Sequence, residues 1–202
     1  MTAKRIFDLI FTVPGLIVLL PFFVLIALWI KLDSKGPVFY RQERVGRYGE
    51  TFKIYKFRTM VKNADKIGGA ITIGDDPRIT KSGKFLRKYK IDELPQLINV
   101  LKGEMSLVGP RPEVIKYVNL YTSEQKEVLN LMPGITDPAS IKYRNENILL
   151  AASRDTYEAS YDPEQVYIQE IMPDKIRINL EYASRATIFT DFKVIVKTIF
   201  GK

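Results

Sequence analysis

The sequence predicts an α/β protein that is mostly helical with a short β element. Three patterns carry this prediction: an uncharged apolar run near the N-terminus, two segments with period-two alternation after it, and helical stripes further along. We expect a re-entrant membrane helix with a basic flank at residues 1–35. A second unit, at residues 36–202, then forms a cytosolic domain with interfacial amphipathic helices, one of them at its C-terminal end.

Composition excludes several kinds of chemistry. The 202 residues contain no Cys and no His, which removes thiol nucleophiles, disulfides, Ser-His-Asp catalysis and ordinary zinc sites. Any metal must therefore be held by oxygen ligands, and any acid or base must be Asp, Glu, Lys or Tyr. A net charge of +8 indicates an anionic partner, which could be a nucleic acid, a membrane surface or a phosphorylated metabolite.

The apolar run is long enough to cross a bilayer. It covers residues 9–30, which is about 33 Å as a straight helix. Pro21 lies near its middle and should kink or break the helix. Basic residues flank the run on both sides, so the positive-inside rule assigns both ends to the cytoplasmic face. A helix that breaks at Pro21 and returns to the same face satisfies both observations; a tilted single span is the alternative, and a buried soluble-core helix is disfavoured.

The following segments are expected in this order. Residues 38–42 and 51–58 alternate as a short hairpin, and the stretch 31–58 has eight basic and three acidic side chains, as expected for contact with anionic lipid. Residues 62–77 form a loop, 80–89 a short helix and 113–131 another helix. The acidic stretch 145–175 faces the cytoplasm. Residues 188–200 form an amphipathic helix that either lies in the membrane interface or closes the core.

An adjacent carboxylate pair, Asp92 and Glu93, stands at the centre of the chain. Pro95 fits only the first turn of a helix, and Gly103 can take the left-handed conformation after its last turn, so a helix starting at Asp92 is expected. Its N-terminal end would favour anions. An ordinary N-cap Asp beside a solvated Glu is the alternative reading of the pair.

Basic residues surround this pair in the sequence. Residues 78–90 contain six Lys or Arg and no acid, and Gly109-Pro110-Arg111-Pro112 is a stiff turn that presents one guanidinium. Carboxylates, an anion-favouring helix end and a fixed Arg together suggest a site for a phosphorylated substrate with a hard cation.

The order of several motifs resembles the bacterial sugar transferase family, the monotopic phosphoglycosyl transferases. The resemblance covers almost the whole chain, in its small form, and rests on the following blocks: Lys4-Arg5-x-x-Asp8, the apolar run broken by Pro, Gly36-Pro37-Val38-Phe39, Phe52 to Met60, Asp92-Glu93-Leu94-Pro95-Gln96, Gly109-Pro110-Arg111-Pro112 and Pro133-Gly134-Ile135-Thr136.

The resemblance implies a function. Such an enzyme moves a sugar 1-phosphate from a UDP-sugar to a membrane polyprenol phosphate (undecaprenyl phosphate) and releases UMP, with Mg²⁺ as cofactor. This is the first membrane step of glycoconjugate assembly, carried out at the cytoplasmic face of the bacterial inner membrane. Its partners would be the two substrates and membrane lipids, without nucleic acid, and a homodimer is possible.

The resemblance also assigns roles to residues. Asp92 would be the covalent nucleophile, Glu93 would orient or activate the reactants, and both would help to hold the metal. Arg111 would bind phosphate and Arg144 the diphosphate. Lys56, Arg58 and Arg87 complete the expected substrate-binding set.

The chain departs from the family pattern at three places: Leu20 replaces a small polar residue before Pro21, Asp137-Pro138 replaces a Gly, and Tyr143 replaces another. The last two put the donor sugar in doubt.

The residues alone leave two rival functions open. A membrane-tethered module that binds nucleic acid or anionic lipid would explain the charge but leave Asp92 and Glu93 without a role. A two-carboxylate glycoside hydrolase would need carboxyls that face each other across a sugar, which neighbouring residues do not provide.

Overall fold

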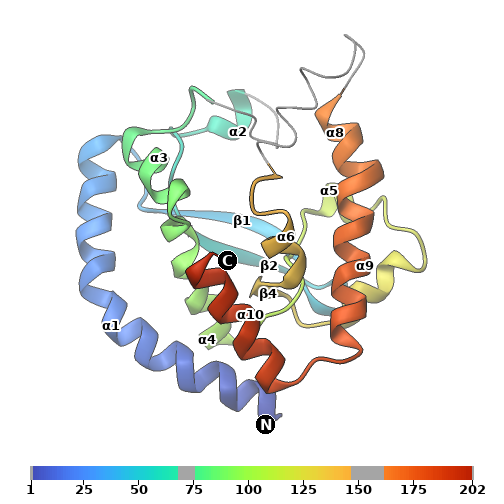
Figure 1. Cartoon of the computed structure of the whole chain (residues 1–202). Coiled ribbons are helices and arrows are strands. Elements are labelled where there is room, and N and C mark those ends of the chain that lie inside the picture. The colour runs from blue at the N-terminus through green and yellow to red at the C-terminus, as the bar shows by residue number, and fades with distance from the viewer. Residues whose placement is uncertain (1, 68–75, 147–161, 202) are drawn as a thin grey trace.

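The computed structural model describes residues 2–67, 76–146 and 162–201. Within them the fold is mostly helical, as predicted, and it has two short two-stranded sheets, of which only the hairpin was predicted. The helix α1 (Ala3–Asp33) follows one side of the molecule, and α8 (Pro163–Val166) and α9 (Met172–Ala183) lie on the opposite side (Figure 1). The hairpin and the short central helices lie between them.

The helix α1 has the length and composition of a membrane helix. Its most apolar 18-residue window has a mean hydropathy of 2.7, and only 11% of that window is buried against the rest of the chain. Pro14 and Pro21 lie inside one uninterrupted helix, so of the expected kink or break at Pro21 only the kink is compatible with α1. The two halves of α1 nevertheless run in different directions in Figure 1, because a proline cannot donate the backbone hydrogen bond and its ring crowds the preceding turn.

The first turns of α1 are fastened to the rest of the protein. Arg5 donates to the carbonyl oxygens of Val100 (2.5 Å) and Leu101 (2.9 Å), at the end of α4 (Leu97–Lys102). The buried Asp8 accepts hydrogen bonds from the Ser106 hydroxyl and the Leu107 N–H, both at 3.0 Å. These contacts fix the start of α1 against the central elements.

Arg58 fastens the other end of α1. Its guanidinium donates to the carbonyl oxygens of Lys35 (2.6 Å), Ser34 (2.7 Å) and Ile30 (3.3 Å). These carbonyls include groups that a helix end leaves without intrahelical partners. Both ends of α1 are therefore bound to the same body of protein.

The predicted hairpin is present. β1 (Phe39–Val45) pairs antiparallel with β2 (Thr51–Phe57), with Phe39 opposite Phe57 and Val45 opposite Thr51. The 3₁₀ turn η1 (Arg47–Gly49) connects the strands. Phe57 is buried with Phe23, Ile30 and Leu86, so the hairpin and α1 share a hydrophobic core. The short helix α2 (Ala64–Ile67) follows the hairpin, at the start of the predicted loop 62–77, part of which lies outside the described residues.

The second sheet brings two sequence motifs together. β3 (Ser106–Val108) pairs in parallel with β4 (Gly134–Thr136). Beyond β3 the chain passes so close to the start of β4 that a Cβ on Gly109 would lie 2.2 Å from Met132 O, and a Cβ on Gly134 would lie 2.1 Å from Gly109 N. Only glycine fits there, and the approach fixes the turn that follows Gly109.

One prediction about the helices of the second half needs correction. Residues 113–131 do not form one helix: α5 (Ile115–Val118) ends early, and the 3₁₀ helix η3 (Gln125–Asn130) starts separately. Much of the acidic stretch 145–175 lies outside the described residues, but its last part is helical. There α8 continues through the π-helical turn η4 (Tyr167–Ile171) into α9. These helices enclose a core cluster with Tyr117, Val128, Tyr167 and Ile176.

The predicted C-terminal helix is present as α10 (Ile188–Phe200), after α6 (Pro138–Lys142) and α9 in the chain. Its apolar stripe does not close the core. Phe189, Ile199 and Phe200 are each more than 60% exposed, whereas Asp191 and Val194 face inward. Asp191 forms an ion pair with Lys4 (2.5 Å), which ties α10 to the start of α1.

Candidate functional site

The carboxylate pair lies where three short helical segments meet. α3 (Lys81–Lys88), capped by Thr80, leads to Lys90, whose left-handed conformation (φ 57°) redirects the chain into the 3₁₀ helix η2 (Ile91–Gln96). α4 follows directly and ends at the left-handed Gly103, as predicted. Asp92 lies inside the first turn of η2, so the expected N-cap role of its side chain is wrong.

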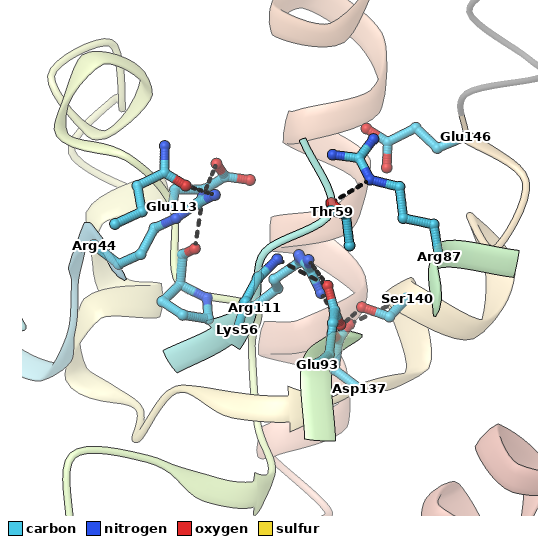
Figure 2. Close-up of polar contacts among 12 residues, drawn as sticks. Arg44, Lys56, Thr59, Arg87, Glu93, Arg111, Glu113, Asp137, Ser140 and Glu146 are labelled. Atoms are coloured by element: carbon cyan, nitrogen blue, oxygen red, sulfur yellow. Dashed lines mark hydrogen bonds and ion pairs between the residues drawn. The ribbon is translucent and has the colours of Figure 1, made fainter. Parts of the chain in front are cut away.

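Glu93 is held by two cations. Arg111 donates from its two terminal nitrogens to Oε2 (3.0 Å) and Oε1 (2.5 Å), and the Lys56 ammonium lies 2.9 Å from Oε1 (Figure 2). Burial alone would raise the pKa of Glu93, but Arg111 and Lys56 outweigh it and hold that pKa well below its usual range. Glu93 is therefore a fixed anion, and the alternative of a solvated Glu is wrong.

Asp92 has the opposite electrostatic character. Its side chain is buried (8% exposed), and its Oδ1 has no hydrogen-bond partner. Burial raises the pKa of Asp92, and the neighbouring Glu93 raises it further, while Lys56, Arg87 and Lys90 oppose both effects. The buried Oδ1 of Asp92 therefore lies without a hydrogen bond among cations, a setting that favours phosphates.

The turn that carries Arg111 is fixed from several sides. Gly109 N–H donates to Thr136 O (2.9 Å), and Gly134 N–H donates to Pro110 O (3.0 Å). Arg44 donates to Pro112 O (3.2 Å). The guanidinium of Arg111 is thus placed by backbone geometry.

Arg44 and Glu113 form a second ion pair (3.8 Å) that sequence reasoning missed, and the Tyr167 hydroxyl donates to Glu113. Figure 2 shows the ion pair of Arg44 and Glu113 on the side of Arg111 away from Arg87. A cavity of about 40 Å³ lies beside it, lined in part by Arg111, Asp137, Lys175 and Asn179. Glu113 directly follows the Gly-Pro-Arg-Pro motif, which is the only local signal for this ion pair. Its partner Arg44 lies on β1, far away along the chain.

Only some of the other predicted substrate-binding residues lie near Asp92 and Glu93. Arg87 is near it, since its charge acts on Asp92, and its Nε donates to the Thr59 hydroxyl (2.9 Å). Arg58 is not: it is 5% exposed, and its guanidinium holds the end of α1. Arg144 lies on the surface and donates to the carbonyl of Thr198 in α10 (3.0 Å).

The donor set suits a Mg²⁺ ion held mainly by substrate. The described residues contain no group of three carboxylates that could hold a metal by themselves. Mg²⁺ commonly binds through one or two carboxylates plus substrate phosphates, and the unpartnered Oδ1 of Asp92 is an oxygen ligand of this kind. Both oxygens of Glu93 already accept hydrogen bonds, from Arg111 and Lys56, so Glu93 would hold a metal only while shared with these cations.

The comparisons with known proteins agree with this chemistry. The family model described as bacterial sugar transferase matches residues 1–201. Exopolysaccharide production protein ExoY of Sinorhizobium fredii is 38% identical over 174 residues, covering 79% of this chain and 76% of that protein. A putative undecaprenyl-phosphate N-acetylgalactosaminyl 1-phosphate transferase of Bacillus subtilis is 44% identical, covering 66% of this chain and 70% of that protein. The UDP-glucose:undecaprenyl-phosphate glucose-1-phosphate transferase of Escherichia coli is 37% identical, covering 98% of this chain and 39% of that protein.

Proposed function

Because this chain belongs to the bacterial sugar transferase family and is therefore a transferase, we propose that it moves a sugar 1-phosphate from a UDP-sugar to undecaprenyl phosphate. UMP is the second product, and the lipid-linked sugar enters polysaccharide assembly. The observation that carries the proposal is the buried, unpartnered carboxylate of Asp92 among cations. The printed names of the relatives support the two substrate classes.

The proposed reaction has two steps. A carboxylate oxygen of Asp92 attacks the phosphorus that bears the sugar. The bond from that phosphorus to the bridging oxygen breaks, and UMP leaves with the electron pair. A phosphate oxygen of undecaprenyl phosphate then attacks the same phosphorus, and Asp92 leaves as a carboxylate. A carboxylate is a competent covalent nucleophile of this kind.

The surrounding residues would position and neutralise charge, which is what phosphoryl transfer requires most. Arg111 and Lys56 hold Glu93 and offer their remaining donors to the diphosphate, while Arg87 stabilises charge near Asp92. A Mg²⁺ ion bound with the donor would add charge neutralisation at the phosphate oxygens. We assign no particular donor sugar, because Asp137 and Tyr143 depart from the family pattern.

A donor-only experiment tests the covalent role of Asp92. Purified enzyme, a panel of UDP-sugars and Mg²⁺, without undecaprenyl phosphate, should release a burst of at most one UMP per enzyme. Mass spectrometry should find the sugar phosphate on the peptide that contains Asp92, and adding undecaprenyl phosphate should restore turnover. Enzyme that turns over with both substrates but gives neither burst nor adduct would rule out Asp92 as a covalent nucleophile.

We further propose that the protein is monotopic, with α1 re-entrant at the cytoplasmic face of the inner membrane. Two observations support this placement. Arg5 and Arg58 bind opposite ends of α1 to the same domain, and the exposed apolar stripe of α10 favours the membrane interface over closure of the core.

Cysteine labelling tests the topology cleanly, because the native chain contains no cysteine. In intact cells, single cysteines introduced at Thr2 and at the hairpin residue Glu50 should both resist a membrane-impermeant reagent and react after lysis. Labelling at Thr2 but not at Glu50 before lysis would contradict the re-entrant placement.

A further inference from the structure

Three aromatic side chains form a continuous exposed row that the proposed reaction does not use. Trp29 of α1 contacts Phe85 of α3 (ring centroids 5.4 Å apart), and Phe85 contacts Tyr89 (4.8 Å). All three are substantially exposed, at 41%, 45% and 56%. We call Trp29, Phe85 and Tyr89 the aromatic ladder.

The packing of α3 explains why the ladder is exposed. Leu86 of α3 is fully buried and packs in the core that contains Ile30 of α1. Phe85 and Tyr89 are four residues apart on α3, so they lie one above the other on another face of that helix. The ladder thus crosses from the membrane helix to α3 along the outside of their shared core.

The ladder ends beside the reactive carboxylate. Tyr89 closes α3, and Asp92 follows three residues later, so their Cα atoms are at most about 11 Å apart. The positive charges of Arg87 and Lys90, which flank Tyr89 in the chain, act on Asp92. The Lys88 ammonium lies 5.5 Å from the centroid of the Tyr89 ring. An apolar surface therefore begins on the membrane helix and reaches a cluster of cations at the site.

We propose that the aromatic ladder binds the isoprenoid chain of the polyprenol phosphate acceptor. The proposal rests on the proposed function and assigns its acceptor site. An isoprenoid chain presents methyl groups and double bonds that pack on ring faces, and its single anionic head complements the cations at the end of the ladder. A chain lying on Trp29, Phe85 and Tyr89 delivers its phosphate to Arg87 and Lys90, next to Asp92.

The sole tryptophan of the chain is Trp29, so its fluorescence reports on the ladder without a label. The protein is placed in nanodiscs that contain a brominated phosphatidylcholine, which quenches tryptophan. Undecaprenyl phosphate should displace the quencher and reduce the quenching at least twofold, whereas the same amount of phosphatidic acid should not. Equal effects of both lipids would mean that the ladder contacts bulk lipid as an ordinary interfacial aromatic belt, and would overturn the proposal.

Kinetics with a matched control give a second test. Phe85→Ala with Tyr89→Ala should raise the KM for undecaprenyl phosphate at least tenfold and leave the donor-only UMP burst unchanged; alanine preserves the helix. Phe189→Ala removes an aromatic ring that is also exposed and adjacent to a lysine, but lies on α10, and should change this KM less than twofold. Equal KM values in wild type and the double variant, or an equal rise in the control, would refute the assignment.

The two tests also separate this inference from the proposed function. Wild-type enzyme that releases no UMP with any UDP-sugar would refute the function, whatever the fluorescence shows. An active wild-type enzyme whose Trp29 is not protected by undecaprenyl phosphate would refute the ladder alone.

Discussion

Asp92 and Glu93 should respond oppositely to the same chemical change. Asp92→Asn and Glu93→Gln each replace a carboxylate by an amide of nearly equal size, in adjacent residues of η2. The raised pKa of Asp92 means that the fold disfavours its charge, and its Oδ1 has no hydrogen-bond partner. Because the amide removes the buried charge, we expect Asp92→Asn to raise the free energy of unfolding at pH 7 by about 1 kcal/mol, at the low end of the desolvation penalty of a buried group, or about 2–4 °C in Tm.

Glu93→Gln should do the reverse. It removes the counter-ion of two cations, Lys56 and Arg111, whose side chains are 15% and 35% exposed. Removing one member of a buried ion pair costs about 3–5 kcal/mol, and we expect about 3 kcal/mol because Arg111 is partly solvated. Since the pKa of Glu93 is lowered in the fold, its stabilisation is present at neutral pH and is lost as the pH falls below 4.5 toward the pKa of the folded state.

The assay is urea or thermal unfolding of the wild type and both variants in the same nanodiscs, at pH 7 and at pH 4. Both variants should lose turnover, so activity alone does not separate them, but their stabilities should shift in opposite directions at pH 7. The deficit of Glu93→Gln should shrink at pH 4. Shifts of the same sign at pH 7 would refute the electrostatic distinction between the two carboxylates.

Three further predictions concern the site and its supports. The donor-only burst rate should fall toward acid with a midpoint above 3.8, because attack requires the carboxylate form and burial raises the pKa of Asp92; a midpoint at or below 3.8 in a pH–rate profile would contradict this. Gly109→Ala should lose about 3 kcal/mol of stability and much of kcat/KM, since its Cβ would lie 2.2 Å from Met132 O, whereas Gly15→Ala, with open space around it, should not. Arg58→Lys should lose about 2 kcal/mol in urea unfolding and leave the KM for the UDP-sugar within threefold; a large rise in that KM would return Arg58 to the donor site.

The sequence predicted the elements whose signals are local. The hairpin, α3 and α10 follow from periodicity, and Gly103 ends α4 as expected. The single helix expected at 113–131 overlooked a Thr-x-x-Gln pattern just before η3: Thr122 N–H donates to the Gln125 side chain, and Gln125 N–H donates to the Thr122 hydroxyl. This reciprocal pair marks a new helical start, and it could have been seen in the sequence.

Other features depend on contacts that no local pattern reveals. Arg58 resembles a substrate ligand in sequence, but it is occupied by the end of α1, which is adjacent only after folding. The parallel pairing of β3 with β4 involves strands too short to show alternation. The ion pairs of Glu93 with Lys56 and Arg111 join three separate segments. Sequence therefore indicated which residues matter at the site more readily than which of them contact one another.

In the proposed monotopic placement, the attachment of α1 at both ends fixes the height of the candidate site above the membrane. An enzyme joined to its anchor by a flexible linker samples many heights and orientations, and its effective concentration at the bilayer falls as the linker lengthens. Here Arg5, Asp8 and Arg58 replace such a linker by direct contacts. In that placement Asp92 is held at one depth relative to lipid headgroups, so we expect the reaction rate to be sensitive to bilayer thickness and lateral pressure.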